Sequence, residues 1–202
     1  MNITASPNLK GFSDYSEHDV INMYAHVSGS VNRGTFVGIS AALGNTNVTQ
    51  GQSSPATPHL NALGSALSSN TPSYANVYRP EVRWKVSSAV QGDIVLGMTL
   101  VDVREVNAWG EKVIFKPRYE RSEQDIVASG EAVPVVTKGV FKINGFSGTP
   151  GPGSGAVIGA GANIGKVVVS AYQTSGAKNP YIVGKFLSSA DADGYALFKL
   201  EL

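Results

Sequence analysis

The chain has 202 residues, with 16 Lys and Arg against 15 Asp and Glu, three His and no Cys. A net charge of +1 gives no broad electrostatic surface for nucleic acid or an anionic membrane, and without Cys there are no disulfides, thiolate nucleophiles or Cys-ligated metals. Only 15% of the residues are charged, where about 25% is usual, and 23 are Gly. Exposed helices are normally coated with charged side chains, so this composition predicts a turn-rich, mainly β protein.

Residues 1–14 are predicted to form a polar N-terminal arm that carries one large apolar side chain, Phe12. The arm has no apolar segment typical of a secretory signal, and no apolar run in the chain approaches the roughly 18 residues of a membrane span. We therefore expect a soluble protein, made in a cytoplasm, with no membrane partner. The rest, residues 15–202, is expected to be a single β-rich domain.

Two patterns compete in residues 15–27. Val20, Met23 and Tyr24 have helical spacing, and Ser16 with Asp19 forms a possible capping box. The same residues also alternate in polarity, as in a strand. We favour a strand here, followed by a second strand at residues 35–40.

Residues 43–75 form a neutral insertion rich in Asn, Ser, Thr, Gly and Pro, and such long loops are usually functional or mobile. One short helix is possible within it, because Thr57-Pro58 suits a helix start and Leu60, Leu63 and Leu67 share a helical face.

The middle of the chain has strand patterns separated by turn residues. Strands are expected at residues 82–86, 94–106, 112–116, 133–136 and 140–143. Ser122 begins a segment, residues 122–129, that fits one or two helical turns. Thr137-Lys138-Gly139 between two apolar runs predicts a β-hairpin.

The C-terminal part begins with a Gly-rich excursion at residues 145–165 and continues with strands expected at residues 166–172, 181–187 and 195–202. Asp193-Gly194 is a tight turn signal that would join the last two strands as a hairpin. The overall prediction is a small β-barrel or β-sandwich-like domain with long Gly/Ser/Asn-rich loops and at most one or two short helices.

The glycines do not match nucleotide-binding motifs. A P-loop that ends at Gly165-Lys166 requires Gly at 160 and Ser or Thr at 167, where the chain has Ala160 and Val167. An EF-hand loop for Ca²⁺ that began at residue 189 would require Asp at its first position and Glu at its twelfth. The chain has Ser189 and Leu200 there. We expect no cofactor and no metal.

Catalytic signatures are also missing from the sequence. His18, His26 and His59 lack metal-ligand spacing, and no G-x-S-x-G or H-E-x-x-H motif occurs. We therefore expect that the protein is not an enzyme.

The two Trp residues lead to different expectations. Trp84 alternates with Val82 and Val86, which predicts a core position. Trp109 lies at a turn beside Gly110, where it either anchors an interface or folds back over its own hairpin.

The closing segment, residues 181–200, resembles capsid decoration (cement, head-stabilising) proteins of tailed bacteriophages. Val183, Gly184, Lys185, Leu187, Asp193 and Gly194 carry the resemblance, in which a Val-Gly-Lys run leads through an acidic Gly turn to an alternating last strand. Residues 22–39 and Gly139-Val140-Phe141 are also similar to the corresponding parts of such proteins. The neutral insertion at 43–75 has no counterpart in the family.

The resemblance implies a small β-rich domain, often trimeric, on the capsid exterior of the virion, that clamps neighbouring subunits of the major capsid protein. The alternative is a phage tail, fibre or host-carbohydrate-binding β domain, which would have a similar composition. The arm at 1–14 could add a strand to a coat-protein edge. The candidate interface residues are Phe12, Tyr15, Leu60, Leu63, Leu67 and Trp109.

Overall fold

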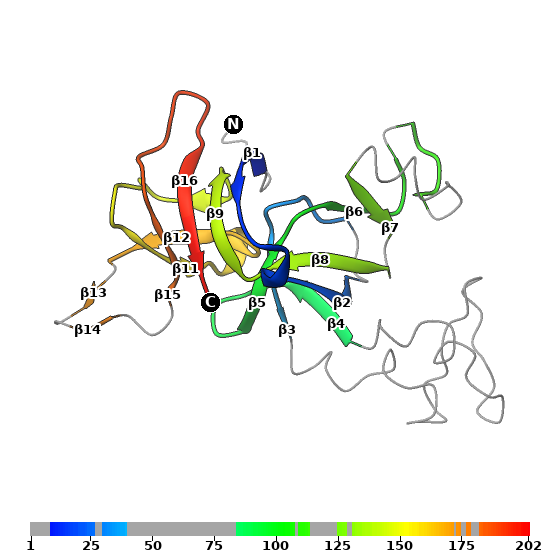
Figure 1. The fold of residues 1–202 in the computed structure, drawn as a ribbon, viewed down its shortest axis with the longest axis horizontal. Helices are drawn as coiled ribbons and strands as arrows, with labels where there is room; N and C mark the ends of the chain where they lie inside the picture. The colour runs from blue at the N-terminus through cyan, green and yellow to red at the C-terminus, as the bar shows by residue number, and fades with distance from the viewer. Residues whose placement is uncertain are drawn as a thin grey trace.

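The computed structural model describes residues 9–26, 30–39, 84–107, 109–113, 125–128, 131–171, 173–174, 177–178 and 182–202. These residues form β-strands with two single-turn 3-10 helices, η1 (Glu17–Asp19) and η3 (Gly161–Asn163), as Figure 1 shows. The predicted mainly β fold is confirmed. The insertion at 43–75, with Leu60, Leu63 and Leu67, lies outside the described residues.

The first half of the fold is a closed β-barrel in the order β2-β4-β3-β5-β8. Its strands are β2 (Val20–His26), β3 (Phe36–Ile39), β4 (Trp84–Ser88), β5 (Ile94–Thr99) and β8 (Ala132–Val136). Only β2 and β4 run parallel among these neighbours. Val37, Val86, Val133 and Val135 fill the interior, because β-branched side chains pack well on a pleated surface.

The second half is a seven-stranded sheet in the order β1-β9-β16-β15-β11-β12-β10 (Figure 1). Its strands are β1 (Leu9–Asp14), β9 (Lys138–Ile143), β10 (Phe146–Ser147), β11 (Gly155–Ile158), β12 (Val167–Ser170), β15 (Ile182–Phe186) and β16 (Ala196–Glu201). The strands predicted in the last third of the chain are confirmed. A separate small hairpin joins β13 (Gln173–Thr174) to β14 (Ala177–Lys178).

One apolar core joins the barrel to the sheet. Phe36 of β3 meets Phe198 of β16 edge-on, with ring centroids 5.9 Å apart, and Phe198 in turn meets Phe186 of β15 at 5.3 Å. Edge-to-face contacts of this kind stabilise aromatic clusters beyond the area that they bury. Two backbone bonds add to the junction: Phe36 N–H donates to Gly165 O, and Gly165 N–H donates to Ala89 O.

The predicted hairpin around residues 137–139 is wrong. β8 pairs with β2 and β5, and β9 pairs with β1 and β16, so the two strands belong to different sheets. Thr137 alone separates them, which is too short for the two-residue loop of a tight hairpin. Its N–H and its hydroxyl both donate to Asp19 O, at 2.9 and 3.0 Å.

The strand favoured for residues 15–27 is confirmed over residues 20–26, and the helical alternative is wrong there. Ser16 Oγ accepts a bond from His18 N–H and caps the short η1, after which the favoured strand, β2, begins at Val20. Residues 9–14, which belong to the predicted N-terminal arm, form β1 at the edge of the chain's own sheet, antiparallel to β9.

The predicted strand at 94–106 is divided in two. After β5, the chain bends at Leu100 and Val101, and β6 (Asp102–Arg104) pairs in parallel with β7 (Ile126–Ala128). The helical turns expected at 122–129 are therefore wrong for residues 126–128, because the β-branched Ile126 and Val127 enter this ladder. We call β6, β7 and the connecting residues 105–113 the lobe; it lies at the upper right of Figure 1.

Candidate functional site

The predicted interface residues that can be placed lie apart from one another. Tyr15 is 39% exposed and stacks on Phe141, with ring centroids 5.7 Å apart. Phe12 lies in β1, but its side chain is outside the described part of the structure, as is that of Trp84 in β4. Trp109 lies in the lobe, far from Tyr15 along the fold. Of the six candidates, the structure describes the side chains of Tyr15 and Trp109, and their role in an interface stays a prediction.

Trp109 is 73% exposed, so the side chain does not fold back over its own hairpin. Val106, on the same turn, is 45% exposed. Isolated exposed apolar residues are common. A large aromatic side chain at this exposure, however, leaves a large apolar area in water, and burial of that area on contact with a partner is favourable. We call Val106 and Trp109 together the apolar knob.

Asn107 holds the turn beneath the knob. Its side-chain oxygen accepts bonds from the N–H groups of Trp109 and Glu111, at 3.0 and 2.9 Å, and its Nδ2 donates to the Glu111 carboxylate at 3.0 Å. Gly110, with φ of 80°, completes the reversal in a backbone conformation that favours glycine. The Trp109 backbone is thus fixed, and its side chain is presented to solvent at a low entropy cost of binding.

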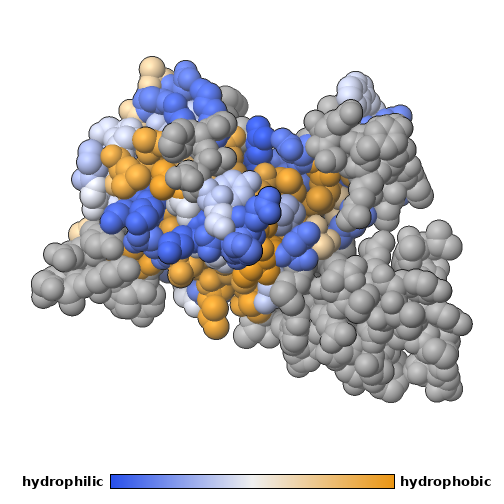
Figure 2. All heavy atoms as spheres, in the orientation of Figure 1, coloured by the Kyte–Doolittle hydropathy of each residue, from blue (hydrophilic) through white to orange (hydrophobic). Residues whose placement is uncertain are grey.

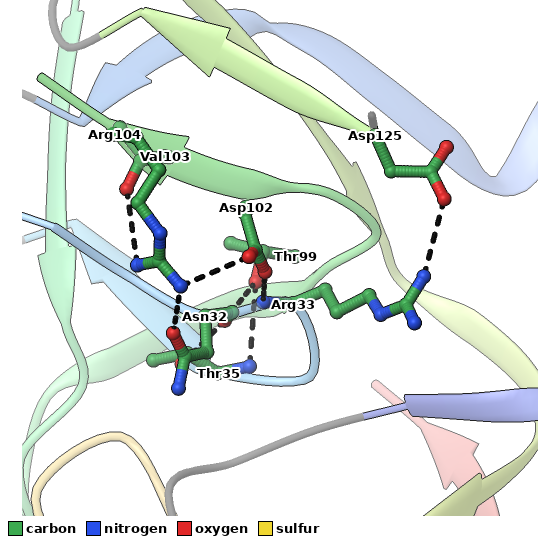
Figure 3. Close-up of polar contacts among 8 residues, drawn as sticks. All are labelled: Asn32, Arg33, Thr35, Thr99, Asp102, Val103, Arg104 and Asp125. Carbon is green, nitrogen blue, oxygen red and sulfur yellow. Dashed lines mark hydrogen bonds and ion pairs between the residues drawn. The ribbon is translucent and has the colours of Figure 1, made fainter. Parts of the chain in front are cut away.

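Polar contacts anchor the lobe to the barrel (Figure 3). The Asp102 carboxylate accepts from Arg33 N–H at 2.7 Å and from the Arg104 guanidinium at 2.9 Å. Arg104 also donates to the side-chain oxygen of Asn32, and Arg33 donates to Asp125 at 3.1 Å. Because charge-assisted bonds are the strongest of their kind, the lobe is held as an extension of the barrel.

A groove of about 410 Å³ lies between the barrel and the seven-stranded sheet. Its apolar lining comes from β5, β11, β15 and the end of the chain: Val95, Val157, Ile158, Ile182, Val183 and Leu202. Leu202 is 50% exposed. Figure 2 shows apolar residues along the lower edge of this face, in the region where Figure 1 places the C-terminus and β5.

The groove has rigid walls. The turn between β4 and β5 forms one side, and Gln91 N–H of this turn donates to Gly159 O, beyond the end of β11, at 3.2 Å. Asp93 adds the one charge among the lining residues, and its carboxylate accepts from Val90 N–H at 2.9 Å. The groove thus combines apolar walls with the polar side chains of Gln91, Asp93 and Ser170, and it can take an amphipathic side chain that has a neighbouring cation.

Two titratable side chains of the described residues are buried within the fold. His26 in β2 is buried, and burial lowers its pKa below the ordinary value. Lys166 is buried beside β12, and burial lowers its pKa too. Within the described ranges, no group of three or more His, Cys, Asp or Glu residues is placed to hold a metal ion.

The acidic turn near the C-terminus is used by the fold. Asp191 accepts bonds from the N–H groups of Asp193 and Tyr195, at 3.0 and 2.8 Å, and pairs with Lys142 of β9. The bond from Lys142 is the main cause of a lowered pKa for the Asp191 carboxyl. Asp193 pairs with Lys10 of β1 at 2.6 Å. The carboxylates that suggested a cation loop instead join the last hairpin to β9 and β1.

Sequence reasoning identified Trp109 but missed the groove. Its lining residues come from four separate stretches of chain and carry no shared motif, so no local signal could have found them. Asn107 could have been found, because an Asn two residues before an exposed turn position is a known turn-stabilising residue.

Comparisons with protein-family models, curated proteins and solved structures find no match to this chain. In the described ranges, none of the helices has the length and apolar character needed to cross a membrane.

Proposed function

We propose that the chain is a non-enzymatic structural protein of a virion, which decorates and stabilises a phage capsid by bridging neighbouring subunits of the major capsid protein. The observation that carries this proposal is the presence of two apolar contact features, the knob and the groove, on different parts of one β body. Bridging can run through neighbouring copies of the protein, each on its own coat subunit, and copies joined in this way need two separate contact surfaces on a body that does not bend between them. The shared Phe36–Phe198 core and the anchored lobe supply that body.

The residues behind the family resemblance are also determinants of this fold, which supports the proposal. Val183 and Gly184 lie in β15 at the centre of the seven-stranded sheet, and Gly194, with φ of 80°, completes the turn into β16. A Cβ on Gly184 would lie 2.3 Å from Lys199 O and 2.4 Å from the Phe198 ring. This position therefore requires Gly for packing reasons that any protein with this hairpin would share.

The alternative function, carbohydrate binding, draws on the same exposed Trp109, because an indole can stack on a sugar ring. Sugar binding also needs free polar groups beside the ring. Asn107, the nearest described amide, uses its side-chain oxygen and nitrogen within the turn itself. The Asn107 amide is therefore engaged within the turn and is not available to a sugar.

The test uses purified full-length protein and heads assembled from the major capsid protein of the source phage. We expect it to bind expanded heads, to leave immature heads unbound, and to raise the temperature at which expanded heads release their contents. Added capsid partners stabilise the assembled state by mass action. Absence of binding to either form, with equal heat and low-salt survival of heads with and without the protein, would contradict the proposal. Binding of a glycan array in place of heads would favour the alternative.

A further inference from the structure

We propose that the apolar knob of one copy of this chain inserts into the groove of a second copy, so that copies associate head to tail. The knob is Val106 with Trp109, and the groove is the 410 Å³ space that Leu202 helps to line. The capsid setting of this contact rests on the proposed function; the contact itself does not. On the shell, the bridged neighbours would be copies of this chain, each bound to its own coat subunit through another surface.

The two features match in size and chemistry. A groove of this volume is within the range of roughly 300–1,000 Å³ that accommodates drug-sized ligands, and an indole ring is smaller than these. Apolar side chains are available on both sides, Val106 and Trp109 on the knob and Val157 and Leu202 in the groove. Hydrogen bonds hold the backbone of the turn that carries Trp109 and join one wall of the groove to Gly159, so the backbone on both sides needs little reordering on association.

The turn that carries the knob has three exposed charged residues, Glu105, Glu111 and Lys112, of which Lys112 shares a face with Val106. Val106 and Lys112 are antiparallel partners in an isolated bridge, and paired side chains project from the same face of a ladder. Lys112 is exposed, and it adds a cation beside the apolar knob. Asp93 is the charged residue that lines the groove. Glu105 precedes Val106 and, by strand alternation, projects to the opposite face from the Val106 side chain.

A chain cannot place its own knob in its own groove. The lobe projects at the upper right of Figure 1, whereas the C-terminus, and with it Leu202, lies on the other side of the barrel. A knob that occupies the groove must therefore come from another molecule. A contact between two different patches is heterologous, and it either closes into a ring or extends as a chain of copies.

The area involved predicts a weak contact in solution. A Trp side chain buries about 150–250 Å², compared with about 800 Å² per partner in a stable complex. Copies that are already held on a shell would associate more strongly, because tethering raises their effective concentration.

The first test is sedimentation of the full chain over a wide concentration range. The wild type should rise above its monomer mass of 21.1 kDa at high concentration. Trp109→Ala should lower the association constant at least about tenfold, as for interface anchors. Ser170→Trp, which fills the groove from β12, should do the same, and Leu202→Asp, at an exposed position, provides a groove variant that leaves the fold intact. Ile164→Ala, an exposed apolar residue of neither feature, is the matched control.

A mixture of variants tests the head-to-tail arrangement itself. Trp109→Ala retains a groove, and Leu202→Asp retains a knob, so each alone should remain monomeric. Their mixture has one intact interface and should form a 1:1 heterodimer that grows no further. A wild type that stays monomeric at every concentration, or a mixture that fails to associate, would overturn the inference. Association through a symmetric Trp–Trp contact would also appear as failure of the mixture.

Heads separate this inference from the proposed function. We expect Trp109→Ala to bind expanded heads as the wild type does but to give less protection against heat. Equal protection by both proteins contradicts the knob-in-groove contact and leaves capsid binding in place. Heterodimers without any head binding support the contact and contradict the capsid function.

Discussion

The side-chain oxygen of Asn107 accepts a hydrogen bond from the backbone N–H of Trp109 at 3.0 Å, and this bond sets the direction in which the most exposed aromatic of the described chain projects. Because Asn107 itself is 9% exposed, the support lies inside the lobe while the ring lies outside it. A buried amide that orders the backbone beneath an exposed ring reduces the backbone entropy that a contact must cost, since this ordering is complete before a partner arrives.

Replacement of Asn107 should therefore weaken the association between copies of the chain, even though Trp109 is retained. Asn107→Ala loses the bonds to Trp109 and Glu111, and we expect a loss of about 1–2 kcal/mol in the free energy of unfolding. The association constant in sedimentation should fall, although Trp109 is unchanged. Asn22→Ala, at an exposed position of β2, is the control. Unchanged association of Asn107→Ala would show that the turn needs no such support.

Gly184 should tolerate no side chain. In Gly184→Ala, the new Cβ would meet Lys199 O and the Phe198 ring at distances well inside contact, so β15 and β16 must move apart. Such overpacking typically costs about 1–3 kcal/mol, measured as the shift of the urea unfolding midpoint. Gly151→Ala is a matched control, since the nearest atom to its added Cβ is Ser154 Oγ at 3.6 Å. Equal midpoints for the two variants would contradict the packing argument.

His26 should make stability depend on pH. Burial lowers its pKa in the folded state below the value of 6.5 that applies to the unfolded chain. The unfolded chain thus binds the proton first, and stability is greatest above this value and falls as pH decreases toward the folded pKa. The slope approaches about 1.4 kcal/mol per pH unit.

The measurement compares unfolding of the wild type and of His26→Gln between about pH 7.5 and pH 5. The variant should lose the additional slope below pH 6.5, even if its stability at neutral pH is lower. His18→Gln, at an exposed position of η1, should retain the wild-type slope. A wild-type slope in His26→Gln would assign the pH dependence to other groups.

Asp191 stabilises the last turn in two ways, by accepting backbone hydrogen bonds and by pairing with Lys142, and two substitutions can separate these contributions. Asp191→Asn keeps a side-chain oxygen for Asp193 and Tyr195 but loses the charge that pairs with Lys142. Asp191→Ala loses both. Melting temperatures should therefore fall in the order wild type, Asn variant, Ala variant, and amide exchange at Tyr195 should become faster in the same order. Identical exchange in all three proteins would show that the turn closes without this carboxylate.

Strands with local signals could be predicted from the sequence. In β16, Ala196, Phe198 and Leu200 alternate with Leu197, Lys199 and Glu201, and the structure buries the first set. This pattern depends only on neighbours along the chain, as does the Asp193-Gly194 turn. The composition alone indicated the absence of long helices.

Pairing between distant segments could not be predicted in this way. β9 looked like the partner of β8, yet it pairs with β16 over six residues from Lys138 to Ile143 and with β1 on its other side. The predicted β8–β9 hairpin does not form, because β9 is already flanked by β1 and β16, which come from opposite ends of the sequence. The groove is missed for the same reason, since its walls meet only after the barrel and the sheet have packed together.

Thr137 links the two halves of the molecule without a spacer, and this has a mechanical consequence. Its backbone and its hydroxyl are both tied to Asp19 O, so neither β8 nor β9 can slide without breaking bonds at the same residue. A force applied to the lobe passes through β5 and β8 into the large sheet with no hinge to absorb it. Movement of the barrel relative to the large sheet must therefore break the two Thr137 bonds to Asp19 O.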